Sequence, residues 1–465
     1  HRGTPRVRVL VSMPQGHRDV TNEPSWGWKA GNDMAQPGRR TVLSLLAASA
    51  AATACAPRAR DRSASGEDHR VRVWHELPPN EQARSMTQMA FDFGRRRPAS
   101  AITIHESMVG PGYLAQLRKA IDTANAPSLA QLPDILVPQF AQEGILGDVT
   151  GFAEQYRDIF DRGPMSHITY LDRIQGLPLD SSPLVLFYDV EAWDSAGVAV
   201  PTTWDDLLKV GTTLARRGRY ITDFPVNDIA WFAAICDAAG APWFRVTDDG
   251  DWQINIDSAQ VAALALTWQK LVRDAGLPLS HGFATPQIAQ LLGSGALVGH
   301  IGAPRDIPAL VSGLSRRPSS RQHDWAVAQL PNPTGQSERI VSYGGSSWAV
   351  FKDCPSVTDA LAFAATCSRN AELLVPRGLM PAANVDKLVT PQAWQFVGSD
   401  VVAQLSDLGA RITRDSARSP AWQATCEAFA PITRAWTGNV PVSTMLPAVA
   451  DAAARQTERY GLRVR

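Results

Sequence analysis

The stretch Ala196-Gly197-Val198-Ala199-Val200-Pro201-Thr202-Thr203-Trp204-Asp205-Asp206-Leu207 holds the clearest structural signal in this chain. Thr203 can accept a hydrogen bond from the backbone amide three residues on, and Asp206 stands in the reciprocal position, so a helix is predicted to begin here. Its end is predicted at 216–218, where two arginines and a glycine suit a helix C-terminus. An apolar strand precedes it at 184–188. The stretch therefore predicts a strand followed by a helix.

The same alternation continues on both sides of this unit. Strands are predicted at 71–74, 102–105, 133–137, 297–301, 325–330 and 348–351, and helices at 81–93, 114–124, 257–275 and 357–367. The C-terminal region is predicted to be mostly helical, and no internal repeat is present. Strands that alternate with helices build βαβ units around a largely parallel sheet. We expect an α/β fold.

Composition excludes several classes of protein. The 465 residues are 45% hydrophobic and carry a formal net charge of 0, which suits two domains or one two-lobed unit and does not favour nucleic acid as a partner. No cofactor motif and no Cys/His spacing typical of zinc occurs, so we expect no cofactor and no metal. The sequence leaves the disulfide state and pairing of four cysteines open: Cys236, Cys354, Cys367 and Cys426.

Residues 39–57 predict export. Arg39 and Arg40 precede a weakly apolar run over 41–54, and Ala52-Thr53-Ala54-Cys55 has the small residues before cysteine that form a lipobox. The run is too short to span a membrane as a helix. We expect Cys55 to be lipidated, although an internal alanine-rich helix is the alternative. The arginine pair leaves Tat and Sec export both open.

This signal divides the N-terminal part of the chain. We expect translation to start at Met34, so that residues 1–54 are an extension followed by a signal peptide. Residues 55–68 are rich in Arg, Asp, Ser, Gly and Pro and are predicted to form a flexible tether. The remainder would lie outside the cytoplasm, anchored to the cell membrane by acyl chains.

Between about residues 69 and 450 the chain contains an ordered series of motifs: Val71-Arg72-Val73-Trp74, Leu132-Pro133-Asp134-Ile135, Glu143-Gly144-Ile145-Leu146, Gly176-Leu177-Pro178 with Leu186-Phe187-Tyr188-Asp189, the stretch 196–207, Gly344-Gly345-Ser346, and Gly378-Leu379-Met380-Pro381. In this order the motifs resemble those of the extracellular solute-binding proteins of ABC importers, in particular the group that binds maltose and glycerophosphodiesters. Asp189 departs from this resemblance, because the family usually has asparagine there.

The resemblance implies a two-lobed periplasmic-binding-protein fold of type II, with interleaved lobes joined by hinge crossings. On the motif positions, we expect residues 69–180 and 299–345 to form one lobe and residues 181–298 and 346–460 to form the other. The ligand would bind in the cleft between the lobes. The resemblance also implies a monomer that delivers a sugar, an amino sugar or a glycerophosphodiester to the permease subunits of an ABC transporter.

A sugar site needs aromatic rings for the C–H faces and planar polar groups for the hydroxyls. Residues that follow strands are placed to reach a cleft, and the resemblance adds Trp231 as a stacking wall. The predicted ligand-binding residues are Trp74, His75, Glu76, Gln139, Asp180, Ser181, Trp231, Trp243, Arg305, Tyr343, Gly344, Gly345, Ser346 and Arg418, with Phe140 and Ser182 beside them. For each tryptophan the alternative is a place in the core.

Two other functions stay open. An exported carbohydrate-active hydrolase would need an acid/base pair, for which Glu76 and Asp180 are candidates. The chain lacks GxSxG, HExxH and SxxK, and two carboxylates also suit binding of hydroxyls or an amine. A ligand sensor without a transport role is the second alternative. Arg305 and Arg418 keep a phosphate-bearing ligand open as well.

Overall fold

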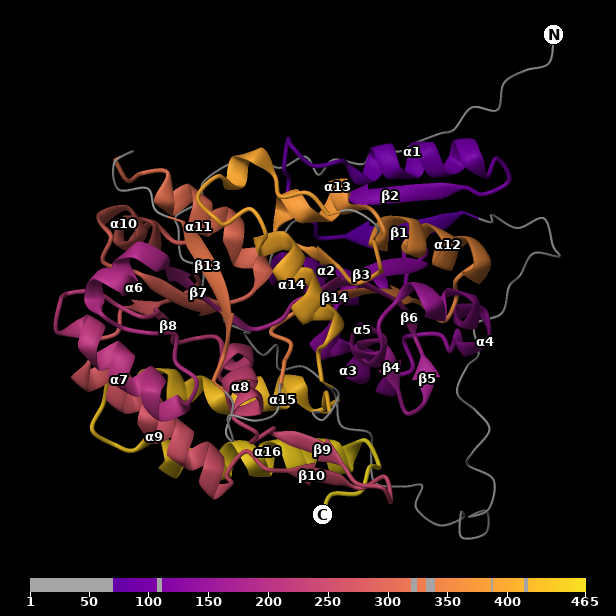
Figure 1. Ribbon diagram of the computed structural model, residues 1–465. Helices are drawn as coiled ribbons and strands as arrows, with labels where there is room; N and C mark the ends of the chain where they lie inside the picture. The colour runs from indigo at the N-terminus through magenta and orange to yellow at the C-terminus, as the bar shows by residue number, and fades with distance from the viewer. Residues whose placement is uncertain (1–69, 107–110, 319–323, 332–338, 386–387, 414–416) are drawn as a thin grey trace, which may run out of the picture.

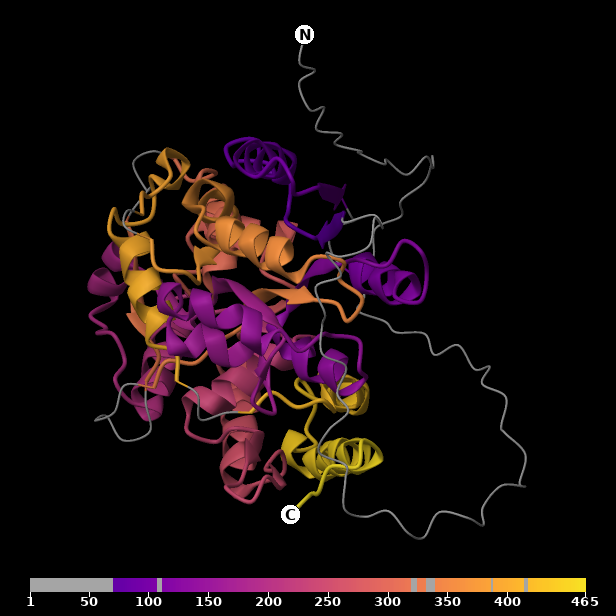
Figure 2. The ribbon, with the colours of Figure 1, turned by 90° about the vertical axis from the view of Figure 1, so that its right-hand side faces the viewer.

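The computed structural model describes residues 70–465 except 107–110, 319–323, 332–338, 386–387 and 414–416. The predicted signal, Cys55 and the tether lie outside the described residues. Within the described part, none of the helices combines the length and the apolar character that a membrane span needs. The described residues form two lobes that lie side by side (Figures 1 and 2).

Lobe 1 contains a six-stranded sheet in the order β15-β6-β14-β3-β1-β2. Strand β1 runs parallel to β2 and β3, whereas β14 runs antiparallel to both β3 and β6. The strands are β1 (Val71–His75), β2 (Ile102–Glu106), β3 (Leu129–Pro133), β6 (Gly176–Ser181), β14 (Ser346–Val350) and β15 (Met380–Pro381). A small hairpin, β4 (Thr169–Tyr170) with β5 (Arg173–Ile174), lies outside this sheet.

The helices of lobe 1 are α1 (Met86–Arg96), α2 (Pro111–Ala120), α3 (Val137–Gln142), α4 (Thr150–Ala153), α5 (Arg162–His167), α12 (Val357–Ser368) and α13 (Ala371–Leu374). Helix α12 packs on β6 and β14, and α1 packs on β2 (Figure 1). All five residues of β14 are buried. A strand covered on both faces reads as an apolar run rather than an alternating one.

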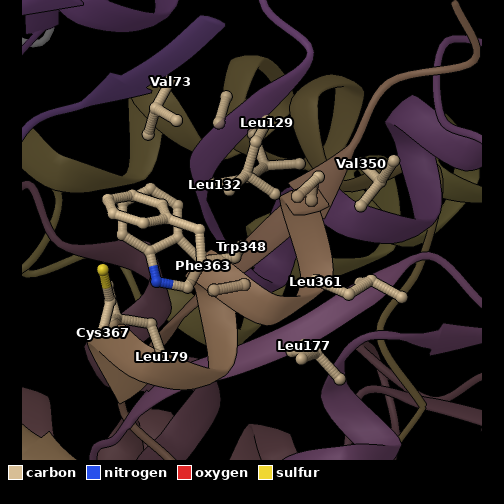
Figure 3. Close-up of a cluster of buried hydrophobic side chains, with 14 of the residues drawn as sticks. Val73, Leu129, Leu132, Leu177, Leu179, Trp348, Val350, Leu361, Phe363 and Cys367 are labelled. Carbon is tan, nitrogen blue, oxygen red and sulfur yellow. The ribbon is translucent and has the colours of Figure 1, made fainter. Parts of the chain in front are cut away.

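Figure 3 shows the core of lobe 1 around Trp348 of β14, with Leu177 and Leu179 of β6 and Phe363 of α12 nearby. Gly176 opposes this strand, and a Cβ there would collide with the Trp348 carbonyl oxygen, so the close approach of β6 to β14 requires glycine. The centre of the lobe therefore joins segments that are far apart in sequence.

Lobe 2 contains a three-stranded antiparallel sheet in the order β12-β7-β13. Along β7, Val185 and Phe187 point into one hydrophobic cluster and Leu186 into another, as the two-residue period of a strand requires. The strands of this lobe are β7 (Val185–Asp189), β12 (Gly299–Gly302), β13 (Trp325–Gln329), and two short pairs, β8 (Phe224–Pro225) with β11 (Leu279–Ser280) and β9 (Phe244–Val246) with β10 (Trp252–Ile254).

Helices contribute side chains to both hydrophobic clusters that include residues of β7 in lobe 2. One cluster draws on α6 (Val190–Ala196), α7 (Trp204–Ala215), α8 (Ile229–Ala238), α9 (Ala259–Asp274), α15 (Trp422–Phe429) and α16 (Leu446–Arg459). The other draws on α10 (Pro286–Ser294), α11 (Ile307–Leu314) and α14 (Val401–Ala410), and it also contains Val375 and Met380 from the lobe 1 side. This second cluster is therefore shared between the lobes.

The α/β fold with two lobes is confirmed, but two segments are exchanged relative to the predicted division. Strand β12, predicted to lie with residues 69–180, pairs with β7 of lobe 2. Strand β14, predicted to lie with residues 181–298, pairs with β3 and β6 of lobe 1. The pairings and the hydrophobic clusters place the described residues of 70–181 and 346–383 in lobe 1, and those of 182–345 and 388–465 in lobe 2. The stretch 299–305 is thus no crossing, because it stays within lobe 2.

Local predictions held best where a capping residue marks a helix. Thr203 accepts a hydrogen bond from the Asp206 amide at the start of α7, and Ser258 caps α9. Three starts were wrong by three residues or more. Helix α2, predicted to begin at 114, begins at Pro111. Helix α1 begins only at Met86, after its cap Ser85. The strand predicted at 133–137 is β3 at Leu129–Pro133, and the chain then turns through η1 (Asp134–Leu136) into α3.

Candidate functional site

A row of hydrogen bonds links the ends of four neighbouring strands in lobe 1. The Glu76 amide, just after β1, donates to Gln131 Oε1 of β3 at 3.1 Å. Gln131 Nε2 donates to Ser346 Oγ of β14 at 3.1 Å, and Ser346 Oγ donates to Asp180 Oδ1 of β6 at 2.5 Å. The structure therefore brings together three of the predicted site residues, which come from distant parts of the sequence.

Asp180 is the acidic end of this row and is 4% exposed. It also accepts a hydrogen bond from the Ser346 amide at 3.0 Å. Burial raises the pKa of this carboxyl to about 7, and the nearby Asp134 contributes in the same direction, while the Ser346 hydrogen bonds and Arg305 oppose the rise. Asp180 can thus change its charge close to neutral pH.

A second polar layer lies behind the row. Asp134, which directly follows β3, is 1% exposed, and its Oδ2 lies 2.9 Å from His167 Nδ1. Ser347 Oγ donates to Asp134 Oδ1 at 2.7 Å. Burial lowers the pKa of His167, as does the Arg418 charge, and these effects outweigh Asp134. The His167 ring is therefore neutral at neutral pH and donates a hydrogen bond to Asp134.

Gly344 and Gly345 form the turn that joins this region to lobe 2. Their φ angles are +93° and +87°, in the region that favours glycine. A Cβ on Gly344 would collide with the Arg305 guanidinium, and one on Gly345 would lie 2.7 Å from Asp134 Oδ2. The glycines let the chain pass between a cation of lobe 2 and a carboxylate of lobe 1.

Lobe 2 contributes Arg305 and Tyr343 at this turn. Arg305 Nη1 donates to the Tyr343 carbonyl oxygen at 2.6 Å, and its Cζ lies 4.0 Å from the centre of the Tyr343 ring. The Tyr343 hydroxyl donates to Asp228 Oδ2 at 2.6 Å, and Ser182 Oγ donates to the Tyr343 carbonyl at 2.8 Å. This group holds a guanidinium beside an aromatic face.

Arg418, in the chain segment before α15, adds a second cation close to the same region. Burial lowers its pKa, whereas the charges of Asp134 and Asp237 favour its charged form. Gln139 of α3 reaches the same lobe, because its Nε2 donates to Gln423 Oε1 of α15 at 3.2 Å. Ser181 lies against α14, where a Cβ on Gly409 would come within 2.9 Å of the serine Cβ. The lobes touch around the polar row.

The residues that end β1 are more enclosed than predicted. Trp74 stacks on His105 with ring centroids 4.0 Å apart and belongs to the lobe 1 core. His75 Nε2 is buried and has no hydrogen-bond partner within the described residues. Burial, with smaller effects of Arg377 and His105, lowers the pKa of His75 to about 4. His75 is neutral, and its Nε2 is available to a ligand or a water.

Trp231 and Trp243 are core residues in this structure, whereas both were predicted to bind ligand and Trp231 to form a stacking wall of the cleft. Trp231 is 1% exposed, its indole nitrogen donates to the Ile301 carbonyl at 2.8 Å, and its ring meets Trp268 edge-on at 4.9 Å. Trp243 is 3% exposed and packs against Phe232. Phe140 is fully buried in the lobe 1 core. Helix α8 is apolar on most of its surface, so its tryptophan turns inward.

Two surface grooves among the described residues lie away from this region. One, of about 350 Å³, runs between α7 and α9, and the other, of about 470 Å³, lies beside α1 and α12. Neither is lined by a predicted site residue. Where the polar row meets the Arg305–Tyr343 group, Asp180, Ser346 and Tyr343 are buried, whereas Arg305 and Gly345 are partly exposed and Gly344 is exposed.

Four polar residues discussed here were not predicted as ligand-binding: Gln131, Asp134, His167 and Asp228. Asp134 was hidden by the misplaced third strand, because the residues taken to follow that strand were Gln139 and Phe140. Asp228 caps α8 by accepting from the Trp231 amide at 2.9 Å, a position that Asn227-Asp228 before an apolar run signals. His167 carries no local signal, since its partner is distant in sequence.

Cys236, Cys354, Cys367 and Cys426 carry thiols rather than disulfide bonds. Over the described part of the chain, no three His, Cys, Asp or Glu side chains gather as ligands for a metal ion.

The chain resembles several solved structures along most of its length. The galacto-N-biose/lacto-N-biose I-binding protein of an ABC transporter from Bifidobacterium longum is 25% identical, with a TM-score of 0.75 over 85% of this chain and 98% of that one. The sugar-binding protein MalE of Xanthomonas citri is 17% identical, with a TM-score of 0.68 over 84% and 99%.

UgpB of Mycobacterium tuberculosis, solved with glycerophosphocholine, is also 17% identical, with a TM-score of 0.62 over 84% and 98%. At 17% identity, this match and that to MalE establish the fold alone. A search of curated proteins finds no match. The model of the family "Bacterial extracellular solute-binding protein" matches residues 99–382, which is more than half of the chain. This protein is therefore a member of the bacterial extracellular solute-binding protein family.

Proposed function

We propose that this protein captures a carbohydrate-type solute between its lobes and delivers it to an ABC importer. The observation that carries the proposal is the meeting of two polar groups at the Gly344-Gly345 turn. The hydrogen-bonded row ending at Asp180 comes from lobe 1, and the Arg305–Tyr343 pair comes from lobe 2. A ligand held by both groups would favour the closed arrangement of the lobes.

The chemistry of the site suits a ligand rich in hydroxyl groups. Carboxylate and amide oxygens accept hydrogen bonds from hydroxyls, and a guanidinium donates to oxygen atoms or to phosphate. We propose Asp180, Ser346, Arg305, Tyr343 and Arg418 as ligand contacts, with His75 and Glu76 at the end of β1. A sugar, an amino sugar and a glycerophosphodiester all fit, in line with relatives solved with lacto-N-biose and glycerophosphocholine.

Binding without chemical conversion is part of the proposal. The family consists of solute-binding proteins. The Asp180 carboxylate, which accepts a hydrogen bond from the Ser346 amide, is suited to holding the hydroxyl groups of a ligand. An exported hydrolase is the competing outcome. Incubation with candidate oligosaccharides followed by mass spectrometry separates the two, because only an enzyme produces shorter sugars.

The anchor and the transporter complete the proposal. Lipidation of Cys55 would hold a monomer at the outer face of the membrane, near the permease subunits that accept the solute. The substitution Cys55→Ala should then release the protein from the membrane fraction or leave it unprocessed. Unchanged fractionation and unchanged mass of the variant would refute the anchor while leaving the binding function untouched.

The binding function is tested by a thermal-shift screen of sugars, amino sugars and glycerophosphodiesters, followed by titration calorimetry of every hit. A ligand at a hundred times its Kd stabilises a protein by roughly 2.7 kcal/mol, which such a screen detects. We expect at least one compound to raise the melting temperature and to bind in a one-to-one ratio. Absence of any hit across the three classes would contradict the proposal.

A further inference from the structure

His300 of β12 is a buried histidine that lies between two carboxylates. It is not one of the ligand contacts proposed above. It is 4% exposed. Its Nδ1 lies 2.9 Å from Asp223 Oδ1 and its Nε2 lies 3.1 Å from Asp306 Oδ2. An ionised carboxylate can only accept hydrogen bonds, so both ring nitrogens must carry protons. The geometry is that of an imidazolium held between two carboxylates.

The surroundings of the ring fix it in place. Phe283 stacks on the imidazole with centroids 3.5 Å apart, and Ser280 Oγ donates to Asp223 Oδ2 at 2.5 Å. A Cβ on Gly302 would collide with His300 Nε2 and Asp306 Oδ2, so no larger residue fits there. Asp223 and Asp306 are the charged groups that face the ring, and Arg305 in turn faces Asp306.

Asp306 connects this histidine to the proposed site. It is the last residue of the short turn η3 (Pro304–Asp306), and its Oδ2 also accepts from the Ala303 amide at 2.9 Å. The turn thereby has a fixed direction, and Arg305 is its middle residue. The carboxylate that His300 contacts therefore fixes the backbone of the turn that carries Arg305, whose guanidinium meets Tyr343.

Electrostatics agrees with this geometry. Burial acts to lower the pKa of His300, but the hydrogen bonds and charges of Asp223 and Asp306 raise it to about 9. The pKa of Asp306 is lowered, because the hydrogen bond and charge of His300, together with the Arg305 charge and the Ala303 amide, outweigh its own burial. His300 thus keeps its charge through neutral pH, unlike His167, which faces one carboxylate.

We propose that His300 is a positioning residue, which as an imidazolium holds Asp306 and so aims Arg305 at the ligand. The step from Arg305 to the ligand rests on the proposed function, whereas the step from His300 to Arg305 does not. As a consequence, ligand binding should weaken when His300 loses its proton at alkaline pH.

The first test needs no ligand and uses the protein labelled with ¹⁵N at histidine and arginine. In NMR spectra at about pH 7, both His300 nitrogens should be protonated, well above the usual histidine pKa of about 6.5. The Arg305 Nη–H signal, assigned with Arg305→Lys, should exchange slowly with water in the wild type, because Nη1 donates to the Tyr343 carbonyl oxygen, and quickly in His300→Gln. The control His281→Gln, at an exposed histidine, should leave Arg305 unchanged. A neutral His300, or an unchanged Arg305 signal in His300→Gln, would overturn the proposal.

The second test is calorimetric titration with lacto-N-biose and with glycerophosphocholine at about pH 7 and about pH 10. We expect His300→Gln to weaken binding about tenfold at the lower pH. The wild type should approach that affinity at the higher pH, and His281→Gln should behave as wild type. Parallel pH profiles of wild type and His300→Gln, with both proteins folded by circular dichroism, would contradict the proposal. If neither probe binds the wild type, the ligand classes proposed above are in question, and the NMR result still decides the role of His300.

Discussion

The polar row of lobe 1 and the core of lobe 2 around Trp231 and Trp268 both contain residues predicted to contact ligand. They differ in the kind of contacts that these residues make. In the row, Asp180 and Ser346 are polar groups bound to each other at the end of a sheet. In the core of lobe 2, Trp231 and Trp268 pack edge to face, and the one polar atom of Trp231 is used by the Ile301 carbonyl.

The difference lies in what each group leaves available. A tryptophan whose nitrogen is bonded and whose faces are packed has nothing left for a ligand, so its role is stability. A carboxylate at the end of a strand keeps acceptor positions, and burial makes each unused one costly. Polar residues that follow strands are therefore better guides to this site than aromatic residues on helices.

The largest effect should come from Trp231→Ala. Truncation of a fully buried aromatic leaves a cavity, and we expect a loss of roughly 3–5 kcal/mol in the free energy of unfolding. Urea denaturation should show a lower midpoint, and affinity should stay native in the folded fraction. Trp231→Phe, the matched control, should lose less. A stable Trp231→Ala variant that no longer binds ligand would show that Trp231 contacts the ligand and is not a core residue.

Arg305→Ala should have the next largest effect, but on binding. Loss of a charged hydrogen bond costs roughly 1.5–3 kcal/mol, which corresponds to a Kd about tenfold to a hundredfold higher. Arg305→Lys should recover little, because lysine lacks the planar group that stacks on Tyr343. Arg463→Ala is the control, since Arg463 is an exposed arginine paired with Asp251. Calorimetry with a ligand from the screen measures all three. If Arg305→Ala binds the ligand as tightly as Arg463→Ala, Arg305 is not part of the ligand site.

Asp180 should give an intermediate effect that depends on pH. The pKa of its carboxyl rises from 3.8 in the unfolded chain to about 7 in the fold, so the folded state binds the extra proton between these values. The stability of the wild type should therefore fall as pH rises through this window, and the stability of Asp180→Asn should fall less. Thermal melts at about pH 5 and about pH 8 measure this difference.

Asp206 provides a control of opposite sign for this pH dependence. The Thr203 hydrogen bond lowers the pKa of Asp206, so the contribution of Asp206 to stability is lost only on acidification. Between these two pH values, the stability of Asp206→Asn should change with pH as that of the wild type does. If Asp180→Asn and the wild type have parallel melting curves over the same range, Asp180 is an ordinary ionised carboxylate.

The smallest effect is expected for Gln423→Ala, which removes the hydrogen bond between Gln423 and Gln139 across the lobes. A neutral hydrogen bond contributes roughly 0.5–1.5 kcal/mol, so the Kd should change by less than about tenfold. Calorimetry on the same ligand measures the change. A loss of affinity larger than that of Arg305→Ala would mean that contact between the lobes, rather than the polar groups, dominates binding.

Local signals in the sequence predicted much of the fold. Thr203 and Ser258 mark their helices because a capping side chain acts within three residues. The lobe assignment of β12 and β14 failed, because the pairing of these strands depends on contacts over more than a hundred residues, which no local pattern records.

For the site, the late glycine turn with Tyr343 and Ser346, together with Asp180 and Arg305, was predicted, and the structure gathers these residues. Asp134 and His167 were missed, because a strand boundary was misplaced by four residues and because His167 meets its partner only in the folded chain. The tryptophans were misassigned, since a sequence does not show whether an aromatic residue has a free face.

We propose that ligand binds where the polar row of lobe 1 meets Arg305 and Tyr343 of lobe 2. A crystal structure of the protein with a ligand from the screen would show whether it binds there. We expect ligand oxygen atoms within hydrogen-bond distance of both Asp180 and Arg305, with Trp231 still enclosed in its core. A ligand in the groove between α7 and α9, or stacked on Trp231, would contradict it.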